Sequence, residues 1–266
     1  MWNEKEKKPI LQYIILTFLI AWIFEALLIL GEQIGILTDT IGVTVVFIIM
    51  AFGAGLAPMY AIYILLKRHG EIKGVKDFCG RIFKTEHLLK TAIITAVFFI
   101  SQLIPNIFCN EYLWNPWYLF ILYIPVMIFG GGLEEVGWRG FLQPALEEKL
   151  PFPVATAILG ILWAVWHVPL WFIQNGNQSS MNFVSFLCHC VVLAFVLALL
   201  YKLTKSVFAC VLLHAWVNVL GGMFTRKTLE APVDFKVLFI YGIEIVLTII
   251  AFYVVNSKVK WVKSAI

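Results

Sequence analysis

The chain has 266 residues, of which 61% are hydrophobic and only 14% are charged, and its formal net charge is +4. A soluble domain carries roughly a quarter charged residues, so this composition excludes a soluble globular protein. It predicts a polytopic membrane protein of the all-α class, and no long basic run gives reason to expect a nucleic-acid partner.

A helix needs about 20 apolar residues to cross the hydrocarbon, and eight apolar segments are candidates, of which the fourth is short because Gly130, Gly131 and Gly132 interrupt it. They are Ile10–Leu30, Ile41–Leu66, Leu88–Ile104, Trp117–Gly130, Val154–Ile173, Phe183–Leu203, Val207–Phe224 and Val237–Val255. The first follows the charged segment Asn3–Lys8, yet it is too long for the apolar region of a signal peptide and lacks a small-residue cleavage site. We therefore predict a retained first span and one transmembrane domain over residues 1–266 with about eight helices.

The distribution of Lys and Arg orients these spans, because cytosolic loops carry an excess of both. Basic residues precede the first span (Lys5, Lys7, Lys8), fill the loop Lys67–Lys84, and follow the sixth span (Lys202, Lys205) and the last (Lys258, Lys260, Lys263). The loops around Asp39, Asn110 and Asn175 carry none, and the group Arg226, Lys227 and Lys236 is an exception diluted by acidic residues. Both termini are predicted to be cytosolic. The Ile- and Lys-rich composition indicates a low-GC bacterium, hence a bacterial plasma membrane.

The basic loop Lys67–Lys84 also contains four apolar residues, Val75, Phe78, Ile82 and Phe83. This pattern fits either an amphipathic helix in the cytosolic membrane interface or a plain basic loop. The five cysteines of the chain have no CxxC spacing, and we expect them to be free.

Three ionisable residues, Glu25, His189 and Glu244, lie singly inside apolar segments. Charged side chains at membrane depth are expensive and usually face the bundle interior. Because each stands alone in the sequence, we interpret each as a single polar group satisfied by a neighbouring helix.

Glu134, Glu135 and Arg139 form the first group of ionisable residues with a spacing. On a helix Glu135 and Arg139 lie four residues apart and can pair, whereas Glu134 is rotated about 100° from Glu135. Pairing with Arg holds one carboxylate ionised and leaves the other able to exchange protons, as a general base requires. An ordinary ion pair at a cytosolic helix end is the alternative.

Two further groups carry histidines. His167 follows Trp163 by four residues and precedes Pro169, which can free a backbone carbonyl nearby. His214 and Asn218 are also four apart, which places imidazole and amide on one helical face. Such a pair can bind an oxyanion, ligate a metal or bond a neighbouring helix, while His167 alone could be an interfacial polar residue. Together the three groups could activate a water and stabilise a tetrahedral intermediate.

The motifs Glu-Glu-x-x-x-Arg, aromatic-x-x-x-His and His-x-x-x-Asn occur in this order between Glu134 and Asn218. This combination resembles the CAAX-processing and bacteriocin-processing (CPBP, or Abi) family of intramembrane endopeptidases, whose best-known branch is the type II CAAX prenyl endopeptidase. The eight-helix layout extends the likeness over most of the chain. The second motif usually begins with Phe, and here it begins with Trp163. We interpret this position as an aromatic body without chemistry, so the change should do little harm.

The resemblance implies an intramembrane endopeptidase that hydrolyses a peptide bond near the C-terminus of a lipidated or hydrophobic peptide or protein, with a catalytic core at about residues 117–224. By this likeness Glu134 would activate the water and His167 would share it. His214 and Asn218 would form the oxyanion hole, and Glu135 and Arg139 would order the first helix. The implied partners are membrane lipid and a substrate such as a prenylated CAAX tail, a bacteriocin precursor or another membrane peptide, of which the composition favours a processed peptide.

The family has been described both as metalloproteases and as glutamate-dependent proteases. The chain lacks an HExxH motif, although Glu134, His167 and His214 could form a His₂Glu zinc site. We favour no cofactor, because Asn218 beside His214 suits an oxyanion hole better than a set of zinc ligands. Two other classes are considered: a bacteriocin immunity or peptide-binding membrane protein without essential proteolysis, and a proton-coupled transporter, for which the expected inverted repeats are missing.

The depth of the motifs requires the fourth span to continue past its glycines. We predict one helix from about Trp117 to Glu148, bent at Gly130–Gly132 and roughly 48 Å long at 1.5 Å per residue. Glu134 would then lie near mid-membrane, within about one water of His167. The site is predicted to be a water-filled cavity open to the cytosol and sideways to lipid.

Overall fold

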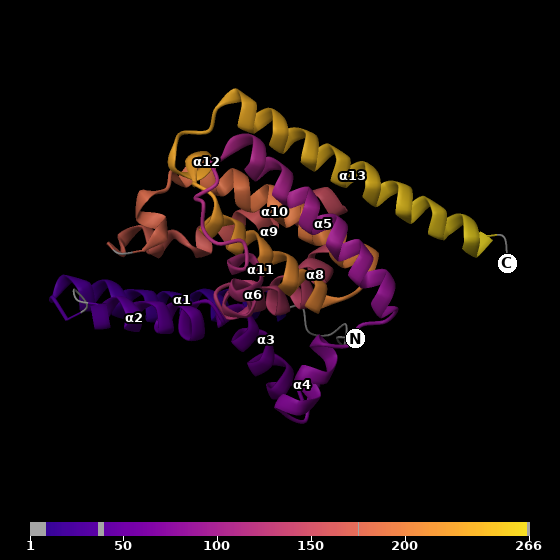
Figure 1. Ribbon diagram of the computed structural model, residues 1–266. Helices are drawn as coiled ribbons and strands as arrows, with labels where there is room; N and C mark the ends of the chain where they lie inside the picture. Colours follow the sequence, from indigo (N-terminus) through magenta and orange to yellow (C-terminus); the bar gives the residue numbers. More distant parts are fainter. Residues whose placement is uncertain (1–8, 37–39, 175, 265–266) are drawn as a thin grey trace.

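The computed structural model describes residues 9–36, 40–174 and 176–264 (Figure 1). Over these ranges the regular structure is helical, apart from one isolated β-bridge between Tyr112 and Phe224. The all-α class is confirmed. Three parts of the orientation argument, the lysines before the first span, Asp39 and Asn175, lie outside the described residues.

In chain order, the α-helices of the described residues are α1 (Pro9–Gln33), α2 (Thr40–Ile49), α3 (Ala57–Arg68), α4 (Val75–Ile82), α5 (Leu88–Cys109), α6 (Leu119–Phe129), α7 (Glu135–Gly137), α8 (Gln143–Glu147), α9 (Phe152–Trp166), α10 (Phe183–Thr204), α11 (Val207–Met223), α12 (Lys227–Glu230) and α13 (Phe235–Ser264). Within the described ranges, six helical segments are long and apolar enough to cross a membrane, and a bent pair, Leu119–Phe129 with Gly132–Glu147, makes a seventh. The remaining predicted segment, Val207–Phe224, forms α11, which has only 17 residues. The chain is therefore a multi-pass membrane protein.

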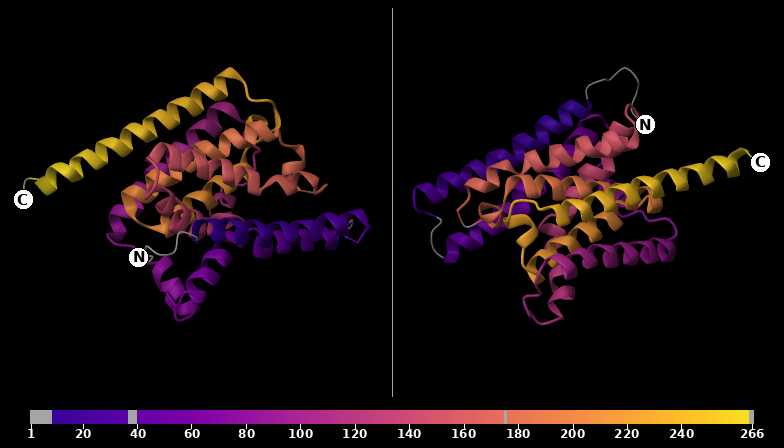
Figure 2. Two further views of the ribbon diagram at one scale, coloured as in Figure 1. Left: turned by 180° about the vertical axis from the view of Figure 1, so that it is seen from behind. Right: turned by 90° about the horizontal axis from the view of Figure 1, so that it is seen from above.

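Helix α10 lies at the centre of the bundle, packed against α9, α11 and α13 (Figure 1). Its approach to α9 depends on Gly160, where an added Cβ would lie 2.7 Å from the Cα atom of Val191. Small residues of this kind let membrane helices pack backbone to backbone. Helix α13 runs along one edge of the bundle and extends beyond it, whereas α1 packs on α3 at the opposite edge (Figure 2).

The predicted span Ile41–Leu66 is divided into α2, a π-helical turn over Met50–Ala54, and α3. Pro58 stands in the first turn of α3, where its missing N–H costs nothing, and it cannot continue the helical ladder from the preceding turn. The basic loop contains α4, so the plain-loop alternative is wrong. The apolar face of α4 packs in part on α3, where the rings of Phe78 and Tyr63 meet at 5.2 Å.

The segment predicted as one helix from Trp117 to Glu148 does bend at its glycines, but it is not one helix. Helix α6 ends at Phe129, and the chain continues through a 3₁₀ turn (Gly132–Glu134), α7, a π turn (Trp138–Leu142) and α8. The axes before and after the break differ by 43°. The break has a local cause, because Gly131 adopts φ +139°, which side chains disfavour, and an added Cβ on Gly132 would lie 2.8 Å from the Val211 carbonyl. The two glycines bring Glu134 against α11.

Candidate active site

Glu134 begins the re-formed helix with one carboxylate oxygen bound and the other turned to an open space. Its Oε2 accepts the indole N–H of Trp163 at 2.8 Å and that of Trp138 at 3.4 Å. The side chain is buried. The prediction that Trp163 supplies only an aromatic body is therefore wrong for this chain, since Phe at this position has no N–H to donate. The two indoles fix Oε2 and leave Oε1 for chemistry.

The open space lies over Gly131, where three polar atoms from two motifs meet. A Cβ added to Gly131 would overlap the Asn218 amide, and it would lie 3.2 Å from His214 Nε2 and 3.5 Å from Glu134 Oε1. Only glycine keeps this space free. The structure thus brings Glu134, His214 and Asn218 together around a volume that a small reactant could occupy.

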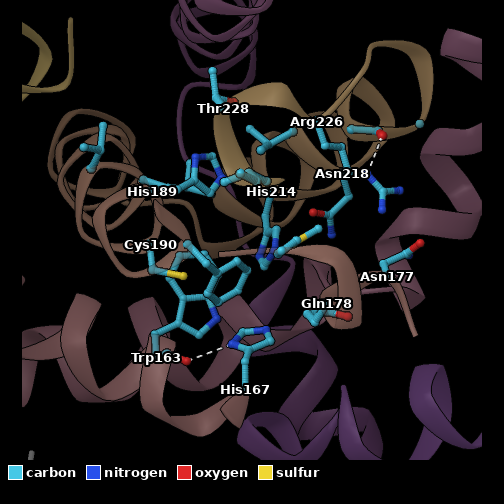
Figure 3. Close-up of a pocket in the computed structure, with 18 of the residues that line it drawn as sticks. Trp163, His167, Asn177, Gln178, His189, Cys190, His214, Asn218, Arg226 and Thr228 are labelled. Carbon is cyan, nitrogen blue, oxygen red and sulfur yellow. Dashed lines mark hydrogen bonds between the residues drawn. The ribbon is translucent and has the colours of Figure 1, made fainter. Parts of the chain in front are cut away.

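His167 terminates α9, and the end of that helix orients its ring. The amide of His167 bonds to the Ala164 carbonyl at 3.1 Å, so the Trp163 carbonyl is left to accept His167 Nδ1 at 2.8 Å (Figure 3). A carbonyl can only accept, so Nδ1 carries the proton, and Nε2 of the neutral ring keeps its lone pair. The ring packs between Trp166 at 4.6 Å and Phe186 at 5.1 Å. His167 therefore presents one basic nitrogen.

Glu135 binds two partners, one predicted and one not. The predicted pair with Arg139 is present at 2.8 Å, with both side chains fully buried, and Arg139 also lies over the Trp163 ring at 5.3 Å. In addition, Glu135 Oε1 lies 3.0 Å from His214 Nδ1. Helical spacing could not reveal this second contact, because the two residues are 79 positions apart. The Glu135 carboxylate holds the His214 proton on Nδ1 and turns Nε2 toward Gly131.

Asn218 lies one turn beyond His214 on α11, as the spacing of four predicts. Its Nδ2 donates to the Gly130 carbonyl at 3.1 Å, which is the last carbonyl before the break after α6. One amide hydrogen is used in this bond, and the second remains available to a ligand.

These side chains line one cavity with a volume of about 480 Å³. The four candidate residues Glu134, His167, His214 and Asn218 all lie on its wall. The three ionisable residues that stand alone in the sequence, Glu25, His189 and Glu244, line the same cavity. Of these, Glu244 accepts a hydrogen bond from Gln102, as expected for a satisfied polar group. Their gathering on one wall was not predicted, because each comes from a different helix.

The cavity extends to the end of the bundle opposite the basic loop. Its lining includes residues of the segments that follow α5, α9 and α11, namely Asn110, Asn177, Gln178 and Thr228. No residue of the described segments 67–87 and 202–206 lines it. The predicted opening to the cytosol is therefore inconsistent with the predicted orientation. His167 and Asn218 lie nearer the C-terminal ends of α9 and α11, at the end of the bundle away from the basic loop.

Two native cysteines can test this sidedness. Cys79 lies in α4 within the basic loop and Cys109 lines the cavity, and both are partly exposed. In variants that keep either Cys79 or Cys109 as the single cysteine of the chain, a membrane-impermeant maleimide added to intact cells should label Cys109. Cys79 should react only after permeabilisation. The reverse pattern would place the cavity mouth in the cytosol and overturn the orientation from Lys and Arg.

The alternative zinc ligands are Glu134, His167 and His214. Among the residues that the structure describes, no group of three His, Cys, Asp or Glu side chains is placed to hold a metal ion. Glu134 Oε2 accepts from two indoles and Nδ1 of each histidine is bonded elsewhere, which leaves Oε1 and the two Nε2 atoms as the open ligand atoms. The three alternative ligands do not form a zinc site as they stand.

Two comparisons with known proteins bear on the site. Residues 114–220 match the model of a family described as type II CAAX prenyl endopeptidase, Rce1-like. A relative from Methanococcus maripaludis, CAAX prenyl protease 2, is 25% identical over 206 residues, which are 70% of this chain and 75% of that protein. The matched family segment contains all three motifs. The resemblance inferred from the motifs is confirmed, and both findings support a membrane endopeptidase.

Proposed function

We propose that this multi-pass membrane protein of the Rce1-like family hydrolyses a peptide bond near the C-terminus of a hydrophobic or lipidated peptide, with a water activated by Glu134 and His167. One observation carries the proposal. Glu134 Oε1, His214 Nε2 and the Asn218 amide surround one open point at Gly131, in a cavity that also contains His167. We place the catalytic core at about residues 117–224 and the protein in a bacterial plasma membrane.

The reaction begins with a water between Glu134 and His167. Glu134 Oε1 accepts its proton while the His167 Nε2 lone pair accepts its second hydrogen in a hydrogen bond, and the water oxygen attacks the peptide carbonyl. The carbonyl oxygen becomes an oxyanion, which accepts from Asn218 and from a protonated His214 Nε2. The proton on Glu134 passes to the amide nitrogen, the C–N bond breaks, and a carboxylic acid and an amine leave.

The charged side chains around His214 and Glu134 support these separate roles. Glu135 faces His214 Nδ1, so its negative charge lies beside the ring that donates to the oxyanion. Removing one donor from such a hole typically costs about 10²–10³ in kcat. The burial of Glu134, Glu135 and Arg139 excludes water from these contacts and strengthens them.

The test is hydrolysis by the purified protein in lipid. A panel of prenylated and unmodified hydrophobic peptides is incubated in ¹⁸O-water, and the masses of the products are measured by mass spectrometry. Cleavage should place one ¹⁸O atom in the new carboxylate. Protection of cells against a bacteriocin that survives Glu134→Ala would instead support the immunity class.

We also infer that the reaction needs no bound metal ion. The support is the donor set: Asn218, whose amide is a poor zinc ligand, accompanies His214, and the described His, Cys, Asp and Glu side chains form no group of three placed to hold a metal ion. A membrane-permeant zinc chelator should therefore leave the rate of hydrolysis within about twofold of its starting value, and metal analysis should find substoichiometric zinc. One zinc per chain that is lost together with activity would reverse this assignment.

A further inference from the structure

Arg226 brings a positive charge to the cavity that the proposed mechanism does not use. Among the described residues on the cavity wall, it is the only Lys or Arg. It follows α11, and its Nε donates to the Gly221 carbonyl at 2.9 Å (Figure 3). Arg226 therefore reaches back along the helix that carries His214 and Asn218.

The contacts of Arg226 leave most of its binding capacity open. A guanidinium has five N–H donors, and the bond to Gly221 uses one of them. That bond also caps an orphan carbonyl at the helix end, which is a sufficient structural role for Nε alone. Within the described ranges no carboxylate forms an ion pair with Arg226, and Glu230, which acts on it electrostatically, is exposed. The two terminal nitrogens form the planar fork that binds carboxylates in pairs of hydrogen bonds.

The position of this fork matches the end of a short peptide. Gly221 lies three residues beyond Asn218, or about 4.5 Å along the helix at about 1.5 Å per residue. An extended peptide advances about 3.3 Å per residue. An offset of about 4.5 Å corresponds to about one to two residues of extended chain, so a peptide whose scissile carbonyl lies at Gly131 can place a C-terminal carboxylate near Arg226 shortly downstream of the cleaved bond.

We propose that Arg226 binds the C-terminal carboxylate of the substrate and so selects cleavage close to a free C-terminus. This inference rests on the proposed function, but it can be tested by binding alone. The side chains of Asn110, Asn177 and Gln178 line the same cavity and carry amides that can bond a peptide backbone. Lys227, the next residue, pairs instead with Glu111 outside the cavity, and it supplies a matched control.

The experiment compares two fluorescent peptides of one sequence, one ending in a carboxylate and one in a carboxamide. Dissociation constants are measured on the protein in lipid nanodiscs, with Glu134→Gln present throughout to prevent turnover. The carboxylate peptide should bind at least about tenfold more tightly than the amide, as for hydrogen bonds to charged groups. Arg226→Gln should weaken only the carboxylate peptide, to the level of the amide, and Arg226→Lys should retain part of the preference because it keeps the charge but not the fork. Lys227→Gln should retain all of it.

Equal binding of both peptides, a preference that survives Arg226→Gln, or no binding of the carboxylate peptide would overturn the proposal. The two hypotheses fail separately. If the protein with Glu134 hydrolyses both peptides equally, the proposed function holds and the role of Arg226 is wrong. If it hydrolyses neither while Arg226 still discriminates in binding, the carboxylate site holds and the proposed function is wrong.

Discussion

Replacing Glu134 with Gln is expected to lower kcat by about 10²–10⁴-fold, the usual contribution of a general base, while the protein still folds. The amide cannot take the proton from water, but its oxygen can still accept the indole N–H groups of Trp163 and Trp138. Initial rates on a cleaved peptide measure the loss. Size-exclusion profile and melting temperature in detergent establish that the variant is folded, and a folded variant with the full rate would remove Glu134 from the mechanism.

Trp163→Phe tests the hydrogen bond from the Trp163 indole to Glu134 separately from the carboxylate itself. It keeps an aromatic ring against His214, whose centroid lies 5.1 Å from the Trp163 ring, and it removes the shorter of the two indole hydrogen bonds to Glu134 Oε2. A hydrogen bond to a charged group is worth about 1.5–3 kcal/mol, so the rate should fall by about 10–100-fold, less than for Glu134→Gln. An unchanged rate would mean that the indole does not orient the carboxylate.

The sequence predicted those features that depend on local spacing. Helical periodicity correctly pairs Glu135 with Arg139 and places His214 and Asn218 on one face. The hydrophobic runs predict nearly every helix, because in lipid each segment must satisfy its own backbone hydrogen bonds. The bend near Gly131 also follows from composition, since adjacent glycines weaken a helix.

The features that were missed depend on contacts between distant segments. The bond from Glu135 to His214 joins two motifs whose separation carries no signal in a single sequence. The indole bond from Trp163 to Glu134 follows from a 3₁₀ turn that rotates Glu134 relative to an ideal helix. The predicted cytosolic mouth conflicts with the predicted orientation, because spacing does not say which end of a helix a side chain approaches. Arg226 contributes to the sequence analysis only as one of the basic residues that orient the spans, because nothing in the sequence shows that its side chain reaches the cavity.

A second large effect is expected on stability when Arg139 is replaced. Arg139→Met leaves the Glu135 carboxylate buried with His214 as its only ionisable partner, and breaking a buried pair in this way costs about 3–5 kcal/mol. Met preserves much of the side-chain volume, so the loss reports the charge rather than a cavity. Thermal unfolding in detergent measures the difference from the unaltered protein.

The double variant Glu135→Gln/Arg139→Met separates the structural role of this pair from its role at His214. With both charges of the pair removed, its stability should recover to within about 1–2 kcal/mol of the starting protein, since buried pairs can often be replaced by neutral groups at little cost. Its activity should remain low, because a neutral amide at position 135 no longer places a negative charge beside the His214 ring that donates to the oxyanion. A double variant that is no more stable than Arg139→Met would show that the two charges are not coupled. One that recovers both stability and activity would show that Glu135 serves only to neutralise Arg139, and the charge-stabilised oxyanion donor would have to be sought elsewhere.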